Sequence, residues 1–230
     1  MKHIPRVYTE DLEDEEFRVP SSGAHHLISV LRMKCGAEFV AFNAKDGEWL
    51  CYITSITRAT VTAMRRSFIR QAPVLSRRVA VAFCLIKHDA MRLIVEKGTE
   101  LGATDFFPLT SRYSMGNINV EKLTMVAIGA TEQSERFHIP KIHDIQELTR
   151  FIRAQPGEFK WISAVERTHD ISKVTPIMDT DLTGSCGFII GPEGGFSDDE
   201  KALLLANTTA VTLSENILRS ETAAIACLAA

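Results

Sequence analysis

The stretch Gly187-Phe-Ile-Ile-Gly-Pro-Glu-Gly-Gly-Phe-Ser-Asp-Asp-Glu200 decides how the second half of the chain is interpreted. An apolar strand runs into a loop with three glycines and a proline, which allows a ligand to approach the backbone closely. Ser197 and Glu200 have the spacing of a capping box and predict that a helix begins directly after the loop. The loop therefore follows the carboxyl end of a strand, where α/β folds bind ligands. A tight connection without a ligand remains the alternative, because the loop is neither a P-loop nor a Rossmann fingerprint.

A second loop with mixed polar and apolar residues, Leu213-Ser-Glu-Asn-Ile-Leu-Arg219, follows another expected strand. Ser220 is expected to cap the Ala-rich helix that comes next. Ile217 and Leu218 either plug the loop into the core or form an apolar wall for a flat ring. Arg219 suits a phosphate or a carboxylate, although an ordinary ion pair with Glu221 is the alternative.

A third segment, Thr131-Glu-Gln-Ser-Glu-Arg136, is expected at the end of a helix. A cation such as Arg136 suits that end of the helix dipole. Gln133 and Arg136 are three residues apart, so we expect them to share one helical face.

The order of expected elements predicts an α/β protein with a small β domain before it. In the first part, strands are expected over 36–43, 48–56 and 60–69, with a turn at Asp46-Gly47 between the first two, a helix over 25–33, and a linker over 71–76 around Pro73. Strands expected over 79–86, 106–110, 159–165, 187–190 and 210–213 then alternate with helices. The first of these helices is expected to place Met91, Ile94, Val95, Gly98 and Leu101 on one apolar face. This alternation favours a mostly parallel sheet.

Composition excludes several classes of protein. The chain has 230 residues, of which 45% are hydrophobic and 24% charged, as in soluble globular proteins. Its apolar runs are too short to cross a bilayer, and its N-terminus does not have the pattern of a secretory signal. The five cysteines are widely spaced, so we expect reduced cytosolic thiols without disulfides or a metal.

Basic residues gather in the first part of the chain. Residues 1–78 hold 12 Lys and Arg against 9 Asp and Glu, although the net charge of the whole chain is −3. The stretch from Trp49 to His88 contains no acidic residue and carries Arg58, Arg65, Arg66, Arg70, Arg77, Arg78 and Lys87. Such a cluster suits phosphate contacts in RNA. The alternative is a solvated basic face, or pairing with the acidic run from Glu10 to Glu16.

Six segments together give the chain a resemblance to a known family. They are Ile4-Pro-Arg6, His26-Leu-Ile-Ser-Val-Leu-Arg-Met33, Glu96-Lys-Gly-Thr-Glu-Leu-Gly102, Glu132-Gln-Ser-Glu-Arg136, Gly191-Pro-Glu-Gly-Gly-Phe-Ser197 and Asn216-Ile-Leu-Arg-Ser-Glu-Thr-Ala223. In this order they resemble the RsmE family, the 16S rRNA uracil-N3 methyltransferases of the SPOUT superfamily. The resemblance runs nearly from end to end of the chain.

This resemblance implies a fold and an activity that the residues alone do not establish. It implies a PUA-like, RNA-binding β-barrel over 1–72 and a SPOUT methyltransferase domain over 73–230, with a deep trefoil knot and a mostly parallel sheet. It further implies a homodimer that uses S-adenosyl-L-methionine and acts in the cytoplasm on 16S rRNA within the assembled small subunit. Two features depart from the family pattern. Leu213-Ser-Glu-Asn216 replaces a Leu-Gly-Pro-Arg loop. The sequence also stops at Ala230, earlier than the family implies, so either the last helix is short or the sequence is truncated.

The resemblance also assigns residues to roles. The cofactor is expected to border Gly191, Glu193, Gly194, Leu213, Asn216, Ile217 and Leu218. Arg136 and Arg219 are expected to orient the uridine or its phosphate and to stabilise negative charge on the uracil, and Glu193 is the candidate general base. RNA contacts are expected from the family-matched Arg6, Arg32 and Lys97, and from Arg65, Arg66 and Arg70 of the basic stretch.

Two other functions stay open at this stage. One is a SPOUT methyltransferase that acts on another rRNA base or on a ribose 2′-oxygen. The other is a ribosome assembly factor that binds RNA without catalysis, which the intact Gly191–Gly195 and Asn216–Arg219 loops disfavour.

Overall fold

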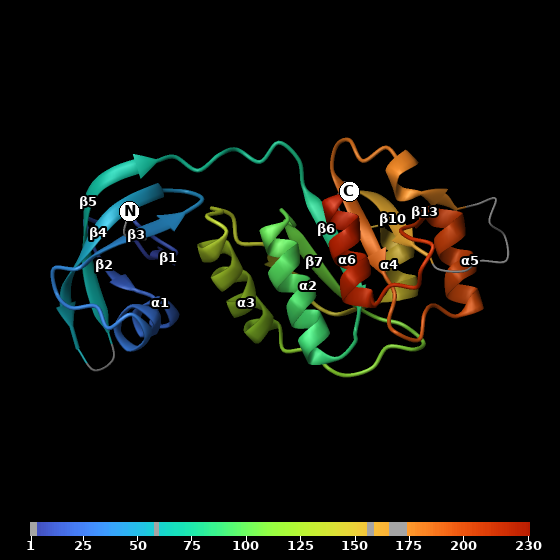
Figure 1. Cartoon of the computed structure of the whole chain (residues 1–230), viewed down its shortest axis with the longest axis horizontal. Coiled ribbons are helices and arrows are strands. Elements are labelled where there is room, and N and C mark those ends of the chain that lie inside the picture. The colour runs from blue at the N-terminus through green and yellow to red at the C-terminus, as the bar shows by residue number, and fades with distance from the viewer. Residues whose placement is uncertain (1–3, 58–59, 156–158, 166–173) are drawn as a thin grey trace. The chain divides into compact units, whose positions relative to one another are not determined.

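The structure is a computed structural model that describes residues 4–57, 60–155, 159–165 and 174–230 (Figure 1). Contacts within the chain divide it into two compact units. The first unit contains Met1–Val74 together with Thr131–His138, and the second contains Leu75–Ala130 and Ile139–Ala230. The segment Thr131–His138, which was expected to belong with the second half of the chain, therefore packs with the first.

The first unit is built on a five-stranded sheet with the order β1-β3-β4-β5-β2. Its strands are β1 (Arg6–Tyr8), β2 (Glu16–Val19), β3 (Glu38–Asn43), β4 (Gly47–Ile56) and β5 (Val61–Arg70). The β3–β4 hairpin turns at Gly47, whose φ of +80° belongs to the left-handed region that glycine adopts freely. The expected hairpin and the strand that follows it are therefore confirmed. Leu12, Leu27 and Phe39 lie in the core of this unit.

The expected helix over 25–33 is wrong in its start and in its type. The α-helix α1 spans Ser21–His25, and a π-helical turn continues from His26 to Val30. Gly23 lets this helix pack closely on β1, because a Cβ at that position would lie 2.3 Å from a methyl group of Val7. Apolar periodicity does not reveal such a contact between a helix and a strand.

The second unit contains an eight-stranded sheet with the order β11-β13-β10-β12-β6-β7-β8, in which β9 also pairs with β7. The pairings described within it are all parallel, which confirms the mostly parallel sheet. Its strands are β6 (Val79–Cys84), β7 (Asp105–Thr110), β8 (Lys141–Ile142), β9 (Gln146–Glu147), β10 (Lys160–Ala164), β11 (Thr175–Pro176), β12 (Cys186–Ile190) and β13 (Thr209–Thr212).

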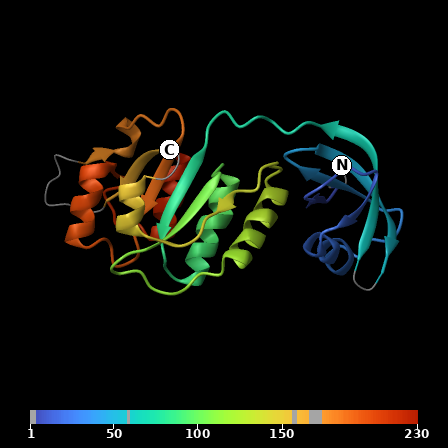
Figure 2. The ribbon, with the colours of Figure 1, turned by 180° about the vertical axis from the view of Figure 1, so that it is seen from behind.

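Helices cover both faces of this sheet. They are α2 (His88–Glu100), α3 (Val120–Gln133), α4 (Leu148–Ala154), α5 (Asp198–Asn207), α6 (Ser220–Ala229) and a 3₁₀ turn at Ile177–Asp179. Helices α2 and α6 pack on the face that Val81, Phe83 and Phe188 share, and they lie in front of the sheet in Figure 1. Helices α4 and α5 pack on the opposite face, and α4 lies in front of the sheet in Figure 2. The expected α/β architecture is therefore confirmed.

Two details of the helices differ from expectation. Helix α3 ends at Gln133, and Glu135 takes a left-handed conformation with a φ of +57°, so Gln133 and Arg136 do not share a helical face. Leu101 is exposed rather than packed on the apolar face of α2, because it already lies past the end of that helix. The trefoil knot stays a prediction.

None of the helices described here is long and apolar enough to cross a membrane.

Candidate cofactor-binding site

Two loops and the end of a strand, at one edge of the parallel sheet, line a cavity of about 430 Å³ in the second unit. The loops follow the carboxyl ends of β12 and β13, and the strand end is that of β10, which lies between these two strands in the sheet. This is the edge at which parallel α/β sheets bind ligands. The cavity lies within the range of about 300 to 1,000 Å³ that is typical of small-molecule sites. The sheet therefore determines where the candidate site lies, and the loops form most of its walls.

The glycine loop after β12 is held in a defined path. Gly195 has a φ of +71°, and its N–H donates to the carbonyl of Pro192 at 2.9 Å. The predicted capping box is confirmed, since Ser197 N–H donates to Glu200 at 2.8 Å and Glu200 N–H donates to the Ser197 hydroxyl at 3.3 Å. The buried Glu200 also accepts a hydrogen bond of 2.8 Å from the backbone of Arg112. One carboxylate thus ties the glycine loop to the loop that follows β7.

The two apolar residues of the loop after β13 have different surroundings. Leu218 lines the cavity and also packs against the core cluster of the second unit, whereas Ile217 lines the cavity and is 59% exposed. Packing into the core therefore describes Leu218. The apolar wall for a flat ring stays a prediction, and Ile217 is its candidate.

Ser220 connects the two cavity loops instead of capping a helix. The N-cap residue of α6 is Arg219, which makes no side-chain cap, and Ser220 is already helical. The predicted cap is therefore wrong. The Ser220 hydroxyl instead donates a hydrogen bond of 2.8 Å to the carbonyl of Gly191. This bond joins the start of α6 to the beginning of the glycine loop.

Replacing Ser220 with alanine is expected to loosen the cavity without unfolding the protein. The resemblance implies S-adenosyl-L-methionine as the ligand, so the affinity for its demethylated product, S-adenosylhomocysteine, should fall about 2- to 10-fold, the equivalent of one hydrogen bond of about 0.5 to 1.5 kcal/mol. Isothermal titration calorimetry measures this change, with Ser67→Ala on exposed β5 as the matched control. Equal affinities in the two variants would show that the Ser220 hydroxyl does not shape the site.

The structure brings the predicted cofactor residues together. Gly191, Glu193, Gly194, Leu213, Asn216, Ile217 and Leu218 line the cavity, and so does Arg219, which was predicted to contact the substrate. Sequence reasoning missed Ala164 and Val165, which also line the cavity. Their place at the carboxyl end of an expected strand was a signal that could have found them. It also missed Lys201, which lies in the first turns of α5 directly after the capping box.

The other predicted residues lie elsewhere. Arg136 belongs to the first unit, where burial lowers the pKa of its guanidinium. Arg32 is exposed, and Lys97 forms ion pairs with Glu96 at 3.0 Å and Glu100 at 2.8 Å on α2. Arg6 is not at the surface, because its side chain is only 7% exposed and forms an ion pair with Glu48.

The arginines of β5 have partners on the first unit, and these are mostly not the acidic run. Arg65 stacks 4.4 Å over the ring of Trp49 and donates to the carbonyl of Glu13 at 2.8 Å. Arg66 pairs with Glu38, and Arg70 pairs with Glu48. Arg66 keeps a side chain that is 62% exposed. Arg58 lies outside the described residues.

Both parts of the chain are similar in sequence to RNA methyltransferases. A family model described as an RNA methyltransferase domain matches residues 73–230, and one described as an RNA methyltransferase PUA domain matches residues 21–63. A relative from Rickettsia conorii, named ribosomal RNA small subunit methyltransferase E, is 31% identical and aligns over 97% of this chain and 93% of its own length. The chain therefore belongs to the family of ribosomal RNA small subunit methyltransferase E.

Two solved structures share the fold. A Legionella pneumophila protein in complex with bound SAM is 26% identical, with a TM-score of 0.85 over 99% of this chain and 96% of its own. The Neisseria gonorrhoeae ribosomal RNA small subunit methyltransferase E, bound to S-adenosyl methionine, is 23% identical, with a TM-score of 0.87 over 99% and 96% of the two chains. The second likeness concerns the fold alone.

Proposed function

We propose that the chain transfers a methyl group from S-adenosylmethionine to N3 of a specific uridine in 16S rRNA. The observation that carries the proposal is the cavity at the carboxyl edge of the parallel sheet, where the expected cofactor residues meet. The names of the family's members support rRNA of the small subunit as the substrate.

The lining of the cavity fits S-adenosylmethionine. Ile217, Val165 and Leu213 offer apolar surface for an adenine ring, and the glycine loop offers backbone groups that can form hydrogen bonds with the edge of that ring. Lys201 supplies positive charge for the carboxylate of the methionine moiety. When bound, this cofactor supplies an electrophilic methyl carbon.

The protein's own contribution is to position the uracil and to favour loss of its weakly acidic N3 proton. Arg219, at the cavity, and Arg136 are the proposed groups that orient the nucleotide and stabilise negative charge that develops on the ring. Glu193 lines the cavity with an exposed side chain, and it is the candidate that accepts the N3 proton. Displacement of water from the cavity by the bound cofactor and nucleotide would strengthen these charge interactions.

RNA binding is proposed for the exposed cations of the first unit, Arg32 and Arg66 foremost. Arg65 and Arg70 hold β5 to its neighbours, and Lys97 pairs with acids on its own helix, so their RNA contacts would compete with these partners. Arg6 is not included, because its buried guanidinium is already engaged by the protein.

Replacing Arg32 and Arg66 together with alanine is expected to weaken RNA binding in a salt-dependent way. Each lost phosphate contact should reduce the slope of log affinity against log salt by about 0.7 to 0.9. Affinity for S-adenosylhomocysteine should not change, because distant sites without shared partners behave additively. Binding titrations over a salt series measure this, with Arg153→Ala, an exposed arginine of α4, as the control. Parallel slopes in the double variant and the wild type would contradict the proposed surface.

The family resemblance supports further parts of the proposal. These are a homodimer, a trefoil knot around the cofactor loops, action in the cytoplasm, and a small-subunit particle as the form of the substrate. Sedimentation at micromolar concentration tests the homodimer, and a monomer with full activity would exclude it.

Two other functions are separated from this one by simple measurements. Methylation of another base or of a ribose 2′-oxygen gives a different modified nucleoside, which mass spectrometry of digested rRNA identifies. An assembly factor without catalysis would bind RNA but would show no affinity for S-adenosylhomocysteine in calorimetry.

A further inference from the structure

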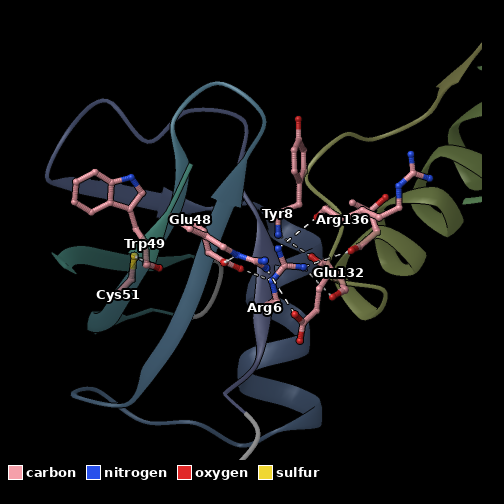
Figure 3. A network of polar contacts seen from close by, with 10 residues as sticks. Arg6, Tyr8, Glu48, Trp49, Cys51, Glu132 and Arg136 are labelled. Atoms are coloured by element: carbon pink, nitrogen blue, oxygen red, sulfur yellow. Dashed lines mark hydrogen bonds and ion pairs between the residues drawn. The ribbon is translucent and has the colours of Figure 1, made fainter. Parts of the chain in front are cut away.

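The end of helix α3 is held by a buried arginine that comes from the first strand of the protein. Arg6 lies in β1, and its side chain is 7% exposed. Its guanidinium donates to the carbonyls of Thr131 at 3.5 Å, Glu132 at 3.2 Å and Arg136 at 3.3 Å (Figure 3). All these groups belong to the first unit. Residues that are about 130 positions apart in sequence are thus joined at one point.

Two of these carbonyls, those of Thr131 and Glu132, lie in the last turn of α3, where a helix leaves its carbonyls without intrahelical partners. The last carbonyls of an α-helix need donors from elsewhere, and the helix dipole favours positive charge at this end. A guanidinium meets both needs, because its planar fork of N–H groups stays charged and can reach several acceptors at once. Arg6 therefore satisfies the carboxyl end of α3 more fully than a lysine could.

The guanidinium of Arg6 is itself fixed by its surroundings. Its Nε donates to Glu48 Oε1 at 2.6 Å, and its plane lies 3.9 Å from the ring centre of Phe42. Burial raises the pKa of Glu48, but hydrogen bonds from Arg70 and Arg6 outweigh this and keep the pKa below its usual range. Glu48 is therefore a charged partner at neutral pH, and Arg6 is held from both sides.

A second bond reinforces the attachment beside Arg6. The backbone N–H of Tyr8, also in β1, donates to Glu132 Oε1 at 2.9 Å. The two strand residues thus bind the backbone and the side chain of the same helical turn.

The turn after α3 has a demanding conformation. Glu135 adopts a φ of +57°, a strained conformation that a residue with a side chain keeps only when its surroundings enforce it. The N–H of Arg136 closes the turn by donating to the carbonyl of Thr131 at 3.1 Å. Arg6 contacts both ends of this turn, and Figure 3 shows the Arg136 side chain pointing away from Arg6.

We propose that Arg6 is a positioning residue, which fixes the turn from Thr131 to Arg136 and thereby the direction in which Arg136 is presented to the substrate. The inference rests on the proposed function, in which Arg136 contacts the target uridine. It assigns Arg6 a role different from the direct RNA contact that its sequence position favours.

Hydrogen exchange tests the structural half of this proposal without any activity measurement. Arg6→Met keeps the length of the side chain but removes its donors, while Glu48 retains Arg70 as a partner. Amides of the segment 131–138 should then exchange at least about tenfold faster than in the wild type, a change of about 1.4 kcal/mol in local opening. Arg6→Lys keeps the positive charge but not the several N–H donors of the guanidinium, so its exchange rate in this segment should lie between those of the wild type and Arg6→Met. Arg18→Met, an exposed arginine on β2, is the matched control and should leave this segment protected.

Methylation kinetics with a double-mutant cycle test the functional half. Arg6→Met should lower kcat/KM for RNA by about 10- to 100-fold, as expected when a substrate-orienting group is misplaced by about 1 Å. Affinity for S-adenosylhomocysteine should stay at the wild-type value. In an Arg136→Ala background, Arg6→Met should cause little further loss, because both changes remove the same contribution.

Each other outcome overturns a distinct part of the proposal. Unchanged exchange in Arg6→Met and Arg6→Lys would show that Arg6 does not hold the turn. Additive losses in the cycle would show that Arg6 acts on RNA independently of Arg136. Full activity of Arg136→Ala would overturn the role given to Arg136 in the proposed function, while the exchange data would still decide whether Arg6 holds the turn.

Discussion

Replacing Gly194 with valine is expected to lower the affinity for S-adenosylhomocysteine by at least about 100-fold, or about 2.7 kcal/mol. A Cβ on Gly194 would lie 2.9 Å from the Cβ of Tyr113, closer than real Cβ atoms approach. Since the Tyr113 Cβ is attached directly to the backbone, the glycine loop itself must move. Gly194 lines the cavity, so this movement deforms the cofactor site. The cause is the clash, because the left-handed conformation in this loop belongs to Gly195.

Calorimetric titration of the folded variant measures the loss. Gly129→Ala is the matched control, because nothing lies within 4 Å of a Cβ at that position in α3. Alanine also has a higher helix propensity than glycine, so the control should keep its affinity and gain slightly in stability. A folded Gly194→Val protein that binds with wild-type affinity would remove the glycine loop from the cofactor site.

Replacing Asp105 with asparagine is expected to lower the free energy of unfolding by about 3 to 5 kcal/mol, the typical cost of breaking a buried ion pair. The Asp105 side chain is 2% exposed and accepts hydrogen bonds from Arg78 at 2.6 Å and Thr104 at 2.7 Å. His143 Nε2 lies 2.9 Å from the same carboxylate, and its ring stacks on Phe107. An asparagine in this position cannot neutralise the guanidinium of Arg78 or accept from all three groups.

The stability effect of this substitution should depend on pH. Burial raises the pKa of Asp105, but hydrogen bonds from His143, Arg78 and Thr104 outweigh it, so the pKa lies below its usual range. The carboxylate therefore stabilises the fold fully above its unfolded pKa of about 3.9, and this contribution is lost as the pH falls through the lower, folded pKa. Urea unfolding from pH 7 down to pH 3 should show the gap between wild type and variant narrowing only below about pH 4. Asp144→Asn, an exposed control, should leave the unfolding free energy unchanged at every pH. Equal free energies of unfolding for the wild type and Asp105→Asn at pH 7 would contradict the account.

Local signals were enough to predict elements of both units, including those that build the candidate cofactor site. The Asp46-Gly47 turn, the apolar run of β6 and the Ser197–Glu200 capping box depend on neighbours in sequence, and the structure confirms all three. Because parallel strands bring their carboxyl ends to one edge, the two loops expected to bind a ligand also meet where that rule places them.

Features that depend on distant partners could not be predicted in this way. From the sequence alone, an arginine is expected to be an exposed cation. Arg6 is buried instead, and its guanidinium donates hydrogen bonds to Glu48 and to the carbonyls of Thr131 and Arg136. A serine before an Ala-rich helix is expected to be its N-cap. The Ser220 hydroxyl instead donates a hydrogen bond to the carbonyl of Gly191, 29 positions earlier in the sequence. In both cases the residue type allowed two roles, and a contact that only the fold creates decided between them.

The central claim, methylation of uracil N3 in small-subunit rRNA, is tested most directly by mass spectrometry of the reaction product. Purified 30S particles that lack the modification are incubated with the protein and S-adenosylmethionine, and their 16S rRNA is digested to nucleosides. We expect one new 3-methyluridine per particle, and none with Gly194→Val. A methyl group found on another base or on a ribose, or the absence of any methylation by a protein that binds S-adenosylhomocysteine, would contradict the account.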